Sequence, residues 1–256
     1  MLRRVASGAV GESLRIYRPD DALLFSSLDA RRPGYARALE LAEEAEFPPI
    51  IRLAGGQAAA FLEESIAFAW AIPDPDAHLH IRPRFESLAN WIATSLCRLG
   101  LDARVGALAG EYCPGEFSIN LAGRVKVMGV GQRVIRGGAH VGGVLTVGQS
   151  ERLRQTLVPI YQALGLEFQP ATAGGVADFD PSLDCEAVMA AMIETLRESG
   201  HVLESHRFDD TIEQEAERLF PIHQARVSME DRKSMGAILR ASQRDGKTLL
   251  QHDPKD

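Results

Sequence analysis

The chain has 256 residues, of which 45% are hydrophobic and only 6% aromatic, and its formal net charge is −7. This length allows one large domain with at most a small appendage, and acids interspersed with bases argue against nucleic acid as a partner. No apolar run approaches the roughly 18 residues that cross a bilayer. Residues 1–11 lack the apolar stretch of a secretory signal, so the sequence predicts a cytoplasmic protein without a membrane partner.

The first hundred residues predict helices that pack on a sheet. A helix is expected over residues 33–47, beginning near a proline and ending before two more, and a strand is expected over 50–53. Residues 65–72 alternate as a strand does, with Ala67, Ala69 and Ala71 on one face. These small side chains leave room for a ligand to lie against the sheet. Residues 82–99 place apolar side chains at helical spacing.

The rest of the chain predicts further strands and then helices alone. Strands are expected over 103–108, 117–121, 124–130 and 141–147, followed by a helix over 150–165. Beyond residue 180 we expect helices over 182–199, 210–220 and 228–243. The predicted fold class is α+β, with a mixed or antiparallel central sheet flanked by helices in residues 1–180. Residues 181–256 are predicted to form a C-terminal helical extension.

Three cysteines at wide spacing predict neither a disulfide framework nor a metal site. Cys97 belongs to the apolar stripe of a predicted helix, where a buried inert thiol is usual. Cys185 opens a predicted helix without other catalytic residue types nearby. Cys113 precedes Pro114 and Gly115, which are turn residues, so its thiol is expected in a loop that substrate can reach. The alternative is a buried loop cysteine without a chemical role.

Lys126 lies inside the predicted strand over 124–130, on the same expected face as Met128 and Val130. An ammonium among apolar neighbours costs free energy unless it is paired or used. The alternative is an edge strand that turns Lys126 to water. Gly129 and Gly131 permit close approach of a ligand to the backbone.

Three motifs together resemble a known superfamily. They are Arg52-Leu-Ala-Gly-Gly-Gln-Ala-Ala, Gly110-Glu-Tyr-Cys-Pro-Gly, and Lys126-Val-Met-Gly-Val-Gly-Gln-Arg. In this order, within residues 20–170, they are similar to the motifs of the biotin/lipoate protein ligase and lipoyltransferase superfamily. The cysteine loop looks like that of its amidotransferase branch, the octanoyl-[glycine cleavage H protein]:protein N-octanoyltransferases.

Several positions depart from the ligase pattern. Gln57 replaces a third glycine, Leu53 replaces an arginine, and Phe61 stands where many ligases carry histidine. These changes weaken the case for an adenylate site but leave a thiol-based transfer unaffected. The segment at His140 has one residue more than the ligases' histidine-glycine signature, so His140 receives no assigned role.

The resemblance implies transfer of an octanoyl or lipoyl group through a thioester on Cys113, without a required cofactor. Lys126 is the second expected catalytic residue, as the donor to the acyl carbonyl oxygen. The implied acyl donor is the glycine cleavage H protein or acyl carrier protein, and the implied acceptors are lipoyl domains of 2-oxoacid dehydrogenase complexes. The residues expected to bind substrate are Arg52, Gly55, Gly56, Gln57, Ala58, Gly129 and Gln132.

Three alternatives remain open at this point. An octanoyltransferase that takes its acyl group only from acyl carrier protein would use the same thiol and lysine. An ATP-dependent lipoate or biotin ligase would use Lys126 to hold an acyl-adenylate, and Cys113 would be incidental. A non-catalytic binding module would retain the pocket alone.

Overall fold

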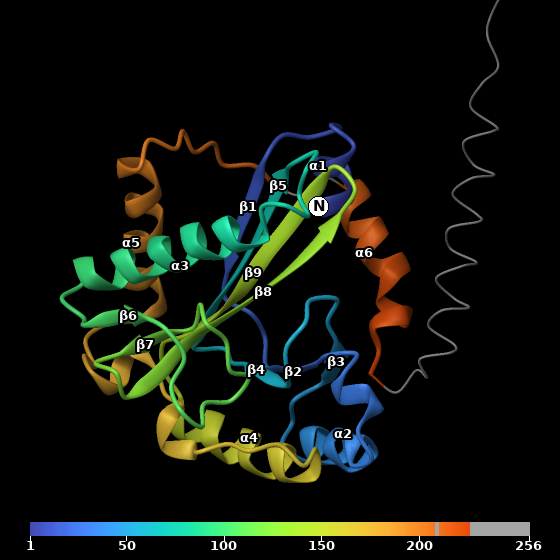
Figure 1. The fold of residues 1–256 in the computed structure, drawn as a ribbon, viewed down its shortest axis with the longest axis vertical. Helices are drawn as coiled ribbons and strands as arrows, with labels where there is room; N and C mark the ends of the chain where they lie inside the picture. Colours follow the sequence, from blue (N-terminus) through green and yellow to red (C-terminus); the bar gives the residue numbers. More distant parts are fainter. Residues whose placement is uncertain (208–209, 226–256) are drawn as a thin grey trace, which may run out of the picture. The chain divides into compact units, whose positions relative to one another are not determined.

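The computed structural model describes residues 1–207 and 210–225, and Figure 1 shows the order of its helices and strands. The chain divides into two compact units, Met1–Arg207 and Phe208–Asp256. Helix α6 (Asp210–His223) is the described part of the second unit and agrees with the helix expected over 210–220. The helix expected over 228–243 lies outside the described residues. Among the described helices, none combines the length and apolar character that crossing a bilayer requires.

The first unit is built around a six-stranded sheet in which every neighbouring pair of strands is antiparallel, so the predicted α+β class is confirmed. Helix α3 (Ile81–Arg98) and strand β5 (Ser65–Pro73) agree closely with their predictions. Strand β1 was not predicted, although its Leu14 and Ile16 alternate with polar residues. Strand β1 (Ser13–Tyr17) lies at one edge of the sheet, next to β5. On the other side of β5 follow, in order, β9 (Gly138–Thr146), β8 (Val125–Ile135), β7 (Ile119–Leu121) and β6 (Ala103–Val105).

Helices α3 and α5 (Cys185–Glu198) pack together on one face of this sheet, as Figure 1 shows. Trp91 of α3 donates its indole N–H to the carbonyl oxygen of Met192 in α5, at 2.8 Å. Val188, Met192 and Leu196 bury the apolar face of α5 in the main core. Helix α5 therefore belongs to the first compact unit, which ends at Arg207.

A smaller mixed sheet lies near α2 (Tyr35–Glu44) and α4 (Ser150–Ala163), which contact each other (Figure 1). Its order is β3 (Pro49–Ile51), β2 (Ala22–Phe25) and β4 (Ala59–Phe61), with β2 parallel to β3 and antiparallel to β4. Strands β2 and β4 are too short to show a clear alternation in sequence. The short helices are α1 (Leu2–Ala6) and the 3₁₀ turns Asp29–Arg31, Pro170–Thr172 and Val176–Asp178.

A β-bulge in β8 decides which of its side chains face which side of the sheet. Ile119 of β7 pairs with Met128, but Asn120 pairs with Lys126, so Val127 is an extra residue on β8. A bulge of this kind shifts the alternation of a strand by one position. Val127 and Met128 both reach the core, and the expectation that Lys126 shares a face with Met128 was wrong.

Candidate active site

Cys113 lies in the loop between β6 and β7 with a φ of 42°, a conformation that a residue with a side chain rarely adopts. Its backbone N–H donates to the hydroxyl oxygen of Tyr161 at 2.7 Å, and that hydroxyl donates to the carbonyl oxygen of Ala58 at 2.8 Å. Tyr161 belongs to α4 and is buried. The strained backbone of Cys113 is therefore linked through Tyr161 to helix α4 and to the residue that precedes β4.

The Cys113 sulfur faces two donors from the segment that connects β3 with β4. The backbone N–H of Gln57 lies 3.2 Å from Sγ, and Nη2 of Arg52 lies 3.6 Å from it. Both contacts stabilise negative charge on the sulfur. Gly56 has a φ of 101°, and a Cβ at this position would lie 2.8 Å from the sulfur. A glycine is needed here for the backbone to come so close to the thiol.

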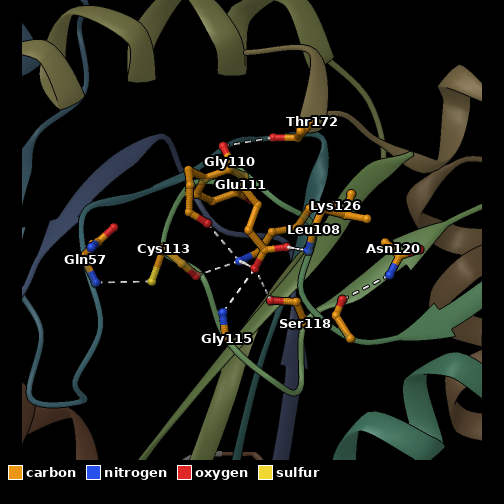
Figure 2. A network of polar contacts seen from close by, with 12 residues as sticks. Gln57, Leu108, Gly110, Glu111, Cys113, Gly115, Ser118, Asn120, Lys126 and Thr172 are labelled. Atoms are coloured by element: carbon orange, nitrogen blue, oxygen red, sulfur yellow. Dashed lines mark hydrogen bonds and ion pairs between the residues drawn. The ribbon is translucent and has the colours of Figure 1, made fainter. Parts of the chain in front are cut away.

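Lys126 is fully buried, so the water-facing alternative for this side chain was wrong. Its Nζ donates to Oε1 of Glu111 at 3.0 Å and to the carbonyl oxygens of Tyr112 at 2.9 Å and Cys113 at 2.7 Å (Figure 2). Burial lowers the pKa of Lys126 from its usual 10.5, while the Glu111 carboxylate opposes that shift. An ammonium has three donors, and all three are used within the protein. Donation to a substrate carbonyl, as predicted for Lys126, would require one of these bonds to be exchanged.

Glu111 was not among the predicted site residues. It is buried, and its Oε1 accepts from Lys126, from the Ser118 hydroxyl at 2.6 Å and from the Gly115 N–H at 3.1 Å. Its Oε2 accepts from the Leu108 N–H at 2.8 Å. One carboxylate thus connects residues on both sides of Cys113 in the loop, from Leu108 to Ser118 (Figure 2). Fifteen residues separate Glu111 from Lys126, and no local spacing rule predicts such a pair.

A cavity of about 390 Å³ opens beside Cys113 on the sheet face opposite α3. Gly131, Gly142 and Ala69 lie side by side on β8, β9 and β5, and all three line the cavity. The alanine face predicted for β5 therefore borders open space at Ala69. Arg52, Gly55, Cys113, Lys126 and Gly129, all predicted site residues, line the same cavity.

The far end of the cavity carries two further basic side chains. Arg133 lies four residues beyond Gly129 on β8 and pairs in register with His140 of β9. Both side chains line the cavity. Burial lowers the pKa of His140 from its usual 6.5, and the positive charges of the N-terminal amine and of Arg133 add to the shift.

The other predicted site residues lie at the edge of the site. Ala58 is buried, and its link to the site is the hydrogen bond that its carbonyl oxygen accepts from the Tyr161 hydroxyl. Gln57 approaches the sulfur through its backbone, and its carbonyl oxygen accepts from Arg52 Nη2 at 2.5 Å. Gln132 accepts from Arg84 and donates to the carbonyl oxygen of Ile81 at 2.8 Å, and it borders a neighbouring cavity instead.

Comparison with known proteins agrees with the resemblance noted in the sequence. The family model for the lipoyl protein ligase A/B catalytic domain matches residues 1–197. An Exiguobacterium protein named octanoyl-[GcvH]:protein N-octanoyltransferase is 27% identical over 157 residues, which are 61% of this chain and 55% of that protein. A Geobacillus kaustophilus protein of the same name is 24% identical over 192 residues, covering 75% of this chain and 65% of its own length. The matched region thus spans between half and two thirds of these curated relatives.

Solved structures show the same fold. A lipoate-protein ligase A bound with ATP superposes with a TM-score of 0.69 at 20% identity, over 86% of this chain and 87% of that one. The bi-partite lipoate protein ligase of Thermoplasma acidophilum gives a TM-score of 0.63 at 19% identity, over 86% and 85% of the two chains. At these identities the likeness concerns the arrangement of helices and strands.

Removing Lys126 should destabilise the protein strongly, because it leaves the Glu111 carboxylate buried without its ionic partner. We expect Lys126→Met to lower the free energy of unfolding by about 3–5 kcal/mol, measured by denaturant unfolding. The double variant Lys126→Met/Glu111→Gln should lose less than the sum of the two single losses. Additive losses would contradict the coupling of the two side chains.

Stability should fall on acidification because of His140. Its pKa is lower in the folded protein than the unfolded value of 6.5, so between these values the unfolded chain binds more protons. The free energy of unfolding should therefore rise with pH across that window, and His140→Gln should flatten the rise in unfolding curves taken from pH 5 to 7. Replacing His78, an exposed loop histidine, is the matched control. An unchanged slope in His140→Gln would contradict the assignment.

Proposed function

The chain belongs to the lipoyl protein ligase A/B catalytic domain family, and on this premise we propose that it transfers octanoyl or lipoyl groups between proteins. In this proposal Cys113 is the nucleophile and carries the acyl group as a thioester. The acceptor is a lysine of a lipoyl-domain protein. The observation that carries the proposal is the position of the Cys113 sulfur, which borders an apolar cavity and faces two N–H donors.

The cavity beside Cys113 suits an acyl tail. Its length along β8 from Gly129 to Arg133 is four residues, or about 13 Å at the rise of a strand. Aliphatic side chains and glycines make up most of its walls, Ala59 and Ala69 among them. Burying about six methylenes at roughly 0.8 kcal/mol each would contribute on the order of 5 kcal/mol to acyl binding.

The first chemical step is attack of the Cys113 sulfur on the acyl carbonyl carbon. Negative charge then develops on the carbonyl oxygen, and donors held near the sulfur stabilise it. The bond from the carbonyl carbon to the acyl donor's nitrogen or sulfur then breaks, and the thiol proton passes to this leaving group. Arg52 and the Gln57 N–H already lie 3.6 Å and 3.2 Å from Sγ, so small movements bring them to that oxygen. We assign them the donor role that the sequence suggested for Lys126.

Lys126 acts as a positioning residue in this mechanism. Its ammonium holds the carbonyl groups of Tyr112 and Cys113, and Glu111 holds the ammonium. The thiol is thereby kept in place on a strained backbone. A fixed nucleophile gains rate because the protein has already lost the orientational entropy of the attacking group.

The second step returns the acyl group to an amine of another protein. When the donor is an amide-linked octanoyl protein, one amide is exchanged for another, and no ATP is required. The names of the relatives point to the glycine cleavage H protein as donor. Acyl carrier protein remains the second candidate donor, because it would use the same thiol and cavity.

Acyl trapping tests the proposal directly. Incubation with octanoylated glycine cleavage H protein should add the mass of one octanoyl group to the chain, detected by intact-protein mass spectrometry. The added mass should be absent in Cys113→Ser and present in Cys97→Ser, because Cys97 lies on α3 away from both cavities. Octanoyl-[acyl carrier protein] is tested beside it to choose between the donors.

Activity that requires ATP and survives Cys113→Ser would instead select a ligase. Retained binding of acyl-lysine with no labelling from either donor would select a binding module. Either result would reject the proposed transfer.

Arg52 provides a separate test of the donor assignment. Arg52→Met should slow the formation of acyl-Cys113 on the order of 10²-fold, as loss of an oxyanion donor does. The rate is followed by quenched-flow sampling and mass spectrometry. Arg133→Met, at the far end of the same cavity, serves as control and should retain most of the rate. Equal slowing in both variants would indicate a general effect of charge in the cavity and not donation at the sulfur.

A further inference from the structure

We propose that a second cavity, on the other side of Cys113, binds the lysine side chain of the protein substrate. This inference rests on the proposed function and adds a site for the amine to the site for the acyl chain. The same cavity would receive the lysine of an amide-linked donor, whose amine is released when Cys113 takes the acyl group.

The second cavity has a volume of about 360 Å³ and meets the first one at the thiol. Cys113, Gly55, Val130 and Gly131 line both cavities. An acyl group bound to Sγ with its tail in the first cavity would therefore present its carbonyl carbon to whatever enters from the second. This is the geometry that aminolysis of a thioester requires.

The two cavities differ in charge. Arg52, Lys126 and Arg133 line the first cavity, and no acidic residue does so in the part of the chain that the structure describes. Glu116 is the charged residue that lines the second, and no lysine, arginine or histidine stands among the described residues of its wall. Phosphate groups of a nucleotide would meet the Glu116 carboxylate on this wall, whereas an ammonium would find a partner in it.

The walls of the second cavity suit the four-carbon stem of a lysine. Phe85 and Phe117 stack with ring centroids 5.2 Å apart and an interplanar angle of 9°, and both line the cavity. Val130 and Pro114 add apolar surface. A stem of methylenes can pack along such side chains while its amine reaches the sulfur.

Glu116 already has a partner on the protein surface. Arg82 donates to both of its oxygens, at 2.9 Å and 2.6 Å, and holds the pKa of Glu116 below its usual value. The carboxylate is therefore ionised at neutral pH and has lone pairs left for an incoming ammonium. Since the Glu116 side chain is 62% exposed, replacing it should leave the fold intact.

The step itself balances without a further reactant. The incoming ammonium is attracted by Glu116, and it releases one proton to water as the apolar walls favour its neutral form. The amine nitrogen forms a bond to the thioester carbon, and the bond from that carbon to Sγ breaks. The proton lost by the amine passes to the departing Cys113 thiolate, which restores the thiol.

The test separates the second step from the first. The chain is acylated with octanoyl-N-acetylcysteamine, and the acyl enzyme is then mixed with n-butylamine as the probe for a lysine side chain. Loss of the octanoyl mass gives the rate of aminolysis. Hydroxylamine, which is uncharged at neutral pH, is measured in parallel as a nucleophile that Glu116 should not attract.

We expect Glu116→Gln to slow aminolysis by n-butylamine about fivefold, and Glu116→Lys on the order of tenfold or more. The hydroxylamine rate should be unchanged in both variants. Arg82→Gln removes the same ion pair from its other side and is the matched control, in which aminolysis should not slow.

Equal rates with n-butylamine in the unchanged protein and both Glu116 variants would overturn the inference. It would also be overturned if Arg82→Gln were as slow as Glu116→Gln, or if ATP inhibited aminolysis saturably. In all these cases the acyl enzyme has formed, so the proposed transfer stands. Failure to acylate Cys113 in the unchanged protein would overturn both proposals together.

Discussion

The site depends on one buried ion pair, between Lys126 and Glu111. Taking both charges out of water costs free energy, and the pair tolerates burial because its members are almost fully hydrogen-bonded. Two of the Lys126 bonds go to backbone carbonyls of the cysteine loop, so the pair links β8 to the segment that carries the thiol. A pair of apolar residues could fill this space, but it could not hold those carbonyls. The pair therefore determines where the sulfur lies.

The cavity proposed for the acyl chain follows from two features of the sheet. Small residues on three adjacent strands leave its face uncovered, and Gly131, Gly142 and Ala69 form one such row. The bulge at Val127 then aligns Lys126 with the glycines of β8 and not with Met128. Without the bulge, strict alternation would direct the ammonium into the core under α3. One extra residue thus separates the polar end of the site from the hydrophobic core.

Much of this fold follows from the sequence because its long elements have strong patterns. Helix α3 and strand β5 repeat apolar residues over enough positions for their period to be plain. The motifs around Cys113 and Lys126 could be located because reactive residue types stand beside glycine and proline. Strands β2 and β4 offer too few positions for any period and were not predicted, although the equally short β3, β6 and β7 overlap strands that were. The bulge also leaves no recognisable pattern in the sequence, because it depends on how two strands pair.

The role of Glu111 was equally hidden, although the residue stands two positions before the predicted nucleophile. A carboxylate in a loop reads as solvated, and only the tertiary structure shows its four hydrogen bonds. Its partner is fixed by the approach of β8, which brings together residues 15 apart in the chain. Pairings of this kind are set by topology and not by local spacing.

In the proposed transfer, one fixed thiol between two unlike cavities serves both chemical steps. The backbone of Cys113 is held by Tyr161 on one side and by Lys126 on the other, so the sulfur does not have to move between partners. In this proposal, selection depends on the two cavities beside the sulfur. The cavity proposed for the acyl chain is apolar with cationic ends, and the one proposed for the amine carries Glu116 at its rim. The donors, nucleophile and walls of the proposed reaction are in place before substrate arrives, so the proposal requires little reorganisation, and a pre-arranged polar site of this kind lowers the barrier most.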